Sequence, residues 1–155
     1  YDMRCRADRS SREIMLAHGT TRADNEWPVE SWIAIGGRLI DTGLRVCVPH
    51  AGAAERDRAA QIVDALGAGA LLLPAMSLAD LPQRMAACGG VIGVDPGLSH
   101  LAVALDLPHV QLFSQPRAWR AGPVGREHQR AVGGDRAPAV DEVWNAWQAV
   151  WACRP

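Results

Sequence analysis

Several polar residues of this sequence follow short apolar runs, and the richest group is the segment DPGLSH that begins at Asp95. Pro96 and Gly97 favour a tight turn, and a helix beginning there would present unpaired backbone N–H groups beside Ser99 and His100. A helix N-terminus with a glycine that permits close approach is suited to bind phosphate. Because its carboxylate would repel phosphate, Asp95 is expected to face a neutral polyol or to cap the helix. A capping box without any ligand explains the same residues and remains an alternative.

Two further groups have the chemistry to bind a phosphorylated ligand. Thr20 and Thr21 offer two hydroxyls and two backbone donors at the end of a predicted strand, and Arg22 adds a guanidinium. Glu55 comes near the start of a predicted helix, where its carboxylate could accept paired hydrogen bonds from a ribose diol. An ordinary strand-to-helix turn is the alternative for the threonines. For Glu55, the local pattern by itself favours simple complementarity with the helix dipole.

These residues need a scaffold that brings them together, and the apolar pattern indicates which. Short apolar runs alternate with segments of helical periodicity, as in a parallel sheet covered by helices. We therefore predict an α/β, Rossmann-like domain with helices on both faces of the sheet. Ligands of such sheets bind beyond the carboxyl ends of the strands, so the polar groups would line one rim. About five strands are expected, at residues 14–18, 44–48, 70–73, 91–94 and 109–113.

The helices are predicted between these strands and after the last one. The first follows Trp27 and Pro28 and is stopped by Gly43, and the others cover about 53–66, 77–88 with Ser77 as a cap, 97–106 and 140–152. Residues 1–13 are expected to be a linker or trailing segment, and 14–155 one Rossmann-like domain. Residues 114–139, rich in glycine and proline, are predicted to be a long loop.

Composition excludes several function classes. The chain has 155 residues, 48% of them hydrophobic, and a net charge of -1, with no lysine. Nucleic-acid binding is not expected at this charge balance. Neither a GxGxxG nor a GxxxxGK[ST] motif is present, which argues against a dinucleotide fingerprint and a P-loop. His109 and His128 are expected to be structural.

The cysteines and the apolar runs bear on metal binding and location. The four cysteines are far apart in sequence, with no zinc-like spacing, so free thiols are expected and no metal site. No apolar run is long enough for a membrane span, and no signal-peptide pattern is visible. A cytoplasmic location is therefore expected.

Taken together, the motifs resemble the C-terminal half of the lipopolysaccharide heptosyltransferases, glycosyltransferase family nine, which have two facing Rossmann-like domains (GT-B type). The resemblance spans roughly residues 14–113 and rests on the TTR…WP segment from Thr20 to Pro28, on Glu55 and on DPGLSH. The GLSH ending is more similar to heptosyltransferase I, which adds the first heptose to a Kdo sugar of lipid A, than to heptosyltransferase II. The resemblance implies a peripheral association with the inner face of the inner membrane.

By this resemblance the chain would bind the donor ADP-L-glycero-D-manno-heptose. The resemblance implies that Thr20 and Thr21 contact the diphosphate and that Glu55 contacts the ribose. It implies that Asp95 contacts the heptose hydroxyls. The phosphate–sugar junction would be contacted by Pro96, Gly97 and His100. Asn25 stands where the family usually has a lysine on the diphosphate, and Pro96 replaces a threonine.

The acceptor site and the catalytic base of such enzymes belong to an N-terminal domain that this sequence lacks. No catalytic residue and no cofactor are therefore expected here, and the chain alone is expected to be inactive. A truncated, non-catalytic Rossmann-like module that no longer binds nucleotide is the alternative function. For the tryptophans of the segment 140–152, the alternatives are packing on a partner domain, burial in this domain's own core, and a membrane-interface role that the lack of basic residues disfavours.

Overall fold

The protein is a parallel sheet covered by helices on both faces. The computed structural model describes residues 11–19, 27–50, 53–75, 79–94, 96–113, 127–133 and 137–154. Within these residues six strands form one sheet in the order β3-β2-β1-β4-β5-β6, and every neighbouring pair is parallel. The strands are β1 (Glu13–Ala17), β2 (Arg45–Val48), β3 (Ala70–Leu72), β4 (Gly90–Gly93), β5 (His109–Phe113) and β6 (Gln129–Gly133).

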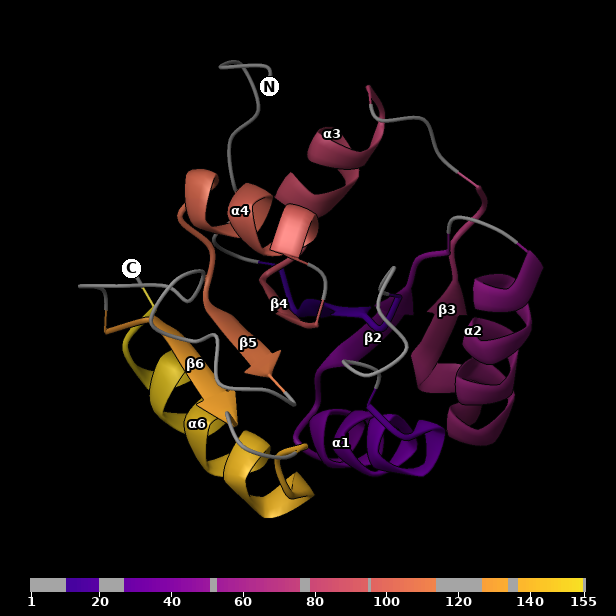
Figure 1. Ribbon diagram of the computed structural model, residues 1–155, viewed down its shortest axis with the longest axis horizontal. Coiled ribbons are helices and arrows are strands. Elements are labelled where there is room, and N and C mark those ends of the chain that lie inside the picture. Colours follow the sequence, from indigo (N-terminus) through magenta and orange to yellow (C-terminus); the bar gives the residue numbers. More distant parts are fainter. Residues whose placement is uncertain are drawn as a thin grey trace.

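Five α-helices accompany these strands in the described part of the chain. Figure 1 shows α3 and α4 on one side of the sheet, and α1 and α6 on the other. None of the described helices is both long and apolar enough to cross a membrane. The helices are α1 (Val29–Asp41), α2 (Ala53–Leu66), which a 3-10 turn (Gly67–Gly69) joins to β3, then α3 (Leu81–Ala86), α4 (Pro96–Ala104) and α6 (Val140–Ala152).

The side chains of the strands alternate between two hydrophobic clusters, because neighbouring residues of a strand point to opposite faces. Ile14 and Leu16 of β1 belong to the cluster formed with α1, α2 and α6. Met15 and Ala17 belong to the cluster formed with α3 and α4. The inner strands β1 and β4 are buried on both faces and consequently read as continuous apolar runs. The predicted α/β class is confirmed.

The sixth strand corrects the sequence prediction. Residues 129–133 were expected within a long loop, but they form β6, which pairs with β5 in parallel over five positions. Its sequence, QRAVG, has little β-propensity, and Arg130 is exposed. Pairing with β5 makes this segment a strand, and the local sequence does not contain that information. Gln129 at its start is buried and donates to the carbonyl of Leu107.

The helix predicted at 77–88 is shorter than expected. It runs from Leu81 to Ala86, with Asp80 as the residue before its first turn, whereas Ser77 lies outside the described residues. Pro82 occupies an early position of the helix, where its missing N–H costs no hydrogen bond. Pro28 likewise directly precedes α1. The predicted and observed bounds of α3 differ at its ends, which local sequence patterns define poorly.

Helix α6 settles one of the alternatives for the tryptophan stripe. Trp147 is 1% exposed and lies in the domain's own core, and its ring rests on Gly90, where an added Cβ would approach a ring carbon to 2.5 Å. Trp151 stacks on Trp147 with ring centroids 5.4 Å apart. Trp144 and Trp151 are only partly buried against the same core.

Candidate functional site at the carboxyl end of the sheet

The strand order places a crevice next to β1. The chain proceeds outward from β1 to β2 and β3, and then returns to build β4, β5 and β6 on the other side. In open parallel sheets ligands bind at this point of reversal, beyond the carboxyl ends of the two central strands. The candidate site is therefore the rim where β1, β2 and β4 end.

Three contacts hold these strand ends and the start of α2 together. The backbone N–H of Val94, just after β4, donates to the carbonyl of Ala17 at 3.1 Å. His18 is fully buried, and its Nε2 donates to the carbonyl of Pro49 at 3.0 Å, which ties the exit of β1 to that of β2. The third contact joins Gly19 to Glu55. Together they give the rim a defined shape at the point where a ligand would bind.

The carboxylate of Glu55 lies directly against the backbone of Gly19. A Cβ added to Gly19 would collide with both carboxylate oxygens of Glu55, so no residue other than glycine fits at position 19 unless Glu55 moves. Glu55 is partly buried in the first turn of α2. Its side chain thus reaches from α2 to the end of β1 and lies on the rim. Complementarity between the carboxylate and the dipole of α2 would not by itself require the Glu55 side chain to point toward β1.

Beneath the rim, a buried histidine fastens α4 to the sheet. His109 Nδ1 lies 2.9 Å from the carbonyl of Val91, and its Nε2 lies 2.9 Å from Ser99 Oγ. Because a carbonyl only accepts, Nδ1 carries the proton and Ser99 donates its hydroxyl to Nε2. Burial lowers the pKa of His109 to about 4, so the ring is neutral at physiological pH. The structural role predicted for His109 is confirmed.

The Ser99–His109 pair is a positioning device that sequence reasoning did not find. It links the first half of α4 to β4 and β5, and so directs the start of α4 toward the rim. The only signal in the sequence is a polar residue within each of two otherwise apolar segments. His128 is structural as well, because its Nε2 lies 2.8 Å from Asp106 Oδ1.

The predicted site residues fall into two groups. Pro96 and Gly97 are the first two residues of α4, and His100, on the same helix, is exposed. With Glu55, these residues belong to elements that meet at the rim. The other four predicted residues, Thr20, Thr21, Asn25 and Asp95, lie outside the described residues.

The tryptophan of the WP pair has a structural role. Trp27 is 2% exposed, and its indole N–H donates to the carbonyl of Pro138 at 2.8 Å. Its ring also meets that of Trp32 edge to face, with centroids 4.9 Å apart. Trp27 therefore anchors the entry to α1 against the segment that leads into α6.

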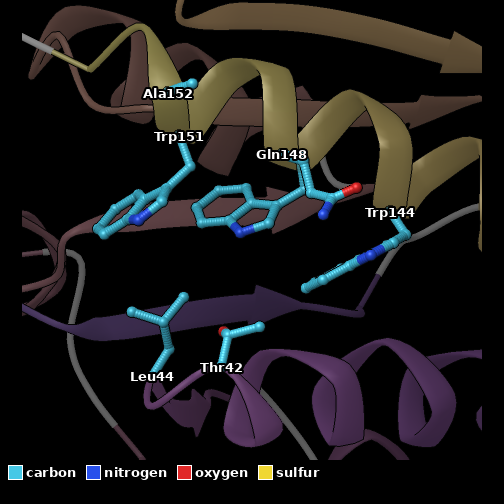
Figure 2. Close-up of a pocket in the computed structure, with 7 residues that line it drawn as sticks. Thr42, Leu44, Trp144, Gln148, Trp151 and Ala152 are labelled. Atoms are coloured by element: carbon cyan, nitrogen blue, oxygen red, sulfur yellow. The ribbon is translucent and has the colours of Figure 1, made fainter.

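An apolar cavity of about 250 Å³ lies elsewhere, between α6 and the turn that joins α1 to β2. In Figure 2, Trp144 and Trp151 extend from α6 toward Thr42 and Leu44. The cavity is near the start of β2, at the amino end of the sheet, and has no charged lining residue. It therefore lacks the groups needed to bind phosphate.

Comparison with known proteins identifies the family. Residues 2–143 match glycosyltransferase family 9 (heptosyltransferase). The chain belongs to glycosyltransferase family 9. Among curated family members, lipopolysaccharide heptosyltransferase 1 of Pseudomonas aeruginosa is 36% identical over 120 residues, which are 77% of this chain and 34% of that protein. The Escherichia coli K12 protein of the same name is 36% identical over 112 residues, or 72% of this chain and 35% of its own length.

Solved structures of the family share the fold. The E. coli heptosyltransferase WaaC with ADP superposes with a TM-score of 0.80 at 29% identity, over 90% of this chain and 44% of that one. WaaC with ADP-2-deoxy-2-fluoro heptose gives 0.72 at 30% identity, over 89% and 42%. This family 9 chain thus spans about a third of the curated relatives and under half of the solved chains.

Proposed function

We propose that this chain is the donor-binding part of a lipopolysaccharide heptosyltransferase I and binds ADP-L-glycero-D-manno-heptose at the carboxyl rim of its sheet. The observation that carries the proposal is the contact between the Glu55 carboxylate and Gly19 beside the crevice between β1 and β4, since a carboxylate there is suited to accept hydrogen bonds from a ribose diol. The similarity to a heptosyltransferase whose structure contains ADP supports the same ligand.

The roles proposed for the rim follow the chemistry of each group. Thr20 and Thr21 contact the diphosphate, with Asn25 nearby in place of a lysine, and Glu55 binds the ribose. Asp95 binds the heptose hydroxyls. The first residues of α4, Pro96 and Gly97, together with His100, bind at the phosphate–sugar junction, where free N–H groups of a helix start favour negative charge.

The proposed reaction is a single inverting displacement. A base deprotonates the acceptor hydroxyl, which attacks the anomeric carbon of the heptose while ADP departs with the bonding electron pair. This chain stabilises the charge that develops on ADP, through backbone N–H groups and hydroxyls already in place. The base and the site for the acceptor, Kdo-lipid A, belong to an N-terminal domain outside these residues.

The proposed domain organisation and location follow from this reaction. Residues 14–155, together with Glu13 at the start of β1, form the donor domain, and the residues before them are a linker or trailing segment. Because the acceptor is a lipid, the complete enzyme would work in the cytoplasm, peripherally at the inner face of the inner membrane. The isolated chain would show no heptosyl transfer from ADP-heptose to a Kdo-lipid acceptor, and product above background would contradict this division of labour.

Calorimetric titration with ADP tests the donor site in the isolated chain. We expect saturable binding by the wild type and about 10- to 100-fold weaker binding by Glu55→Ala, since losing charge-assisted hydrogen bonds costs about 1.5–3 kcal/mol. Thr21→Ala should also weaken binding. Asp64→Ala is the matched control, because Asp64 is an exposed carboxylate on the same helix.

Each outcome of the titration separates the proposed function from its alternative. Wild-type binding that Glu55→Ala weakens and Asp64→Ala leaves unchanged supports the donor site. Absence of heat at millimolar ADP from a folded chain overturns it in favour of a non-catalytic Rossmann-like module. Equal loss in the two variants would place the ADP site elsewhere on the molecule.

A further inference from the structure

Two cysteines far apart in sequence meet at the amino end of the sheet. Cys47 lies in β2 and Cys88 just before β4, and their sulfur atoms are 3.6 Å apart in the cluster between the sheet and α3. Both residues are fully buried. Glu13, the first residue of β1, directs its Oε1 to within 3.7 Å of Cys88 Sγ. The ligand atoms of all three residues lie within 4.8 Å of one another.

These separations match a metal coordination sphere. With metal–sulfur bonds of about 2.3 Å and metal–oxygen bonds of about 2.0 Å, tetrahedral geometry separates two sulfur ligands by about 3.8 Å and a sulfur from an oxygen by about 3.5 Å. The observed 3.6 and 3.7 Å are close to both values. The ligand atoms of the third pair, Cys47 and Glu13, lie within 4.8 Å of each other, so a modest side-chain movement would bring all three around one ion.

A cationic group already lies at this cluster. The guanidinium of Arg84 contacts Glu13 Oε1 at 2.5 Å, and its Nη1 lies 3.7 Å from Cys88 Sγ. The Arg84 and Glu13 side chains are 25% and 17% exposed, so the cluster opens to solvent on this side. An ion would have to reach the carboxylate from this side, in competition with Arg84.

We propose that Cys47, Cys88 and Glu13 form a structural site for a thiophilic divalent cation such as Zn²⁺ or Cd²⁺, with Arg84 holding Glu13 in place when no ion is bound. Two thiolates and one carboxylate are suited to these ions rather than to Mg²⁺. The bound ion would join the start of β1, the middle of β2 and the approach to β4. A water molecule or an added ligand would complete the coordination.

Binding must release the thiol protons. The hydrogen bond with Cys88 and then burial raise the pKa of Cys47 well above its usual value, so this thiol is protonated at neutral pH without an ion. The charged and titratable groups around it are Cys88, Glu13 and Arg84. Because Cys47 loses its proton when the ion binds, affinity should rise with pH, by up to about tenfold per pH unit from this thiol.

The test is a titration of the reduced chain with Cd²⁺, followed by the ultraviolet charge-transfer band of the cadmium–thiolate bond. A C5S/C153S background leaves only the two clustered cysteines. We expect saturation at one ion per chain and a rise in Tm with Zn²⁺, because an ion that binds only the folded state stabilises it. Excess Mg²⁺ should not compete.

Variants of the three proposed ligands should weaken binding of the ion, whereas a variant of Arg84 should strengthen it. Cys47→Ser or Cys88→Ser should abolish the stoichiometric band, and Glu13→Gln should weaken binding about tenfold or more. Arg84→Gln should tighten binding, because it removes the competing cation. Circular dichroism before each titration confirms folding, and the conservative Glu13→Gln and Arg84→Gln variants carry the test if a cysteine variant fails to fold.

Three outcomes would overturn the proposal. One is a band that appears only with a large excess of Cd²⁺. Another is a band that Cys47→Ser leaves unchanged in a folded chain. The third is a disulfide between Cys47 and Cys88 in the purified chain that survives mild reduction and so prevents the ion from binding. None of these outcomes involves ADP, so the result is independent of the proposed donor site.

Discussion

The two ends of the sheet are built from different chemistry. At the carboxyl end, polar contacts such as that between His18 and Pro49 link the exits of neighbouring strands, and a carboxylate lies on a glycine backbone. At the amino end, aromatic rings and buried thiols fill the space, as where Trp147 covers Gly90. The contrast teaches that substitutions of buried side chains at the amino end should change stability, whereas substitutions of the rim residues Gly19 and Glu55 should change ligand affinity.

The largest effect is expected at Trp147. Trp147→Ala removes a fully buried ring and should lower the free energy of unfolding by about 3–5 kcal/mol, as measured by urea denaturation. Trp144→Ala, which removes a partly exposed ring of the same helix, should cost clearly less. Equal losses of stability in the two variants, or a loss of ADP affinity by the folded Trp147 variant, would contradict the separation of stability at the amino end from ligand affinity at the rim.

The buried His109 predicts a loss of stability in acid. Its folded pKa of about 4 is below the ordinary value of 6.5, so the unfolded chain binds more protons between these pH values. The free energy of unfolding should therefore fall as pH drops from 6.5 toward 4, by roughly 3 kcal/mol from this residue, and should be unaffected by it above that window.

Urea denaturation at a series of pH values measures this dependence. His109→Gln should be less stable at neutral pH but should show a flatter decline in acid. His100→Gln is the control, because His100 is exposed on α4 and should keep the wild-type slope. The same slope in all three proteins would mean that His109 does not link α4 to the sheet as a neutral ring.

A smaller effect, on affinity, is expected at Gly19. Gly19→Ala pushes the Glu55 carboxylate from its place, so ADP should bind about tenfold more weakly, with a change in stability under about 1 kcal/mol. Gly37→Ala is the matched control, because an added Cβ there meets nothing within 4 Å. In a Glu55→Ala background, Gly19→Ala should have no further effect on ADP affinity, and additive losses would mean that the two residues act separately.

The smallest expected effect is at Trp27, at the carboxyl end. Trp27→Phe keeps most of the ring but removes the hydrogen bond to Pro138, which should cost about 1 kcal/mol of stability by urea denaturation. Trp151→Phe, on a partly exposed ring, should cost less. A large loss of ADP affinity in Trp27→Phe would show that this anchor also shapes the rim.

Local pattern was sufficient for most of the secondary structure. The predicted bounds of β5, α2 and α6 match the structure, because each element has an apolar period bounded by clear breakers. Strand β6 was missed, since its pairing with β5 rather than its own residues makes it a strand. For the candidate site, the motifs predicted the elements that carry Glu55 and His100. The contact partners of these elements could not be predicted, because they come from distant segments.

By itself, the sequence determined the α/β class, the family resemblance and the set of residues with phosphate and polyol chemistry, because periodicity and motif spacing are local properties. Only the tertiary structure decided that Glu55 lies on Gly19, that Ser99 donates to a neutral His109, and that Cys47, Cys88 and Glu13 meet. Each of these contacts joins segments from different strands or helices. Their proximity depends on how the strands order themselves in the sheet, which no single stretch of chain specifies.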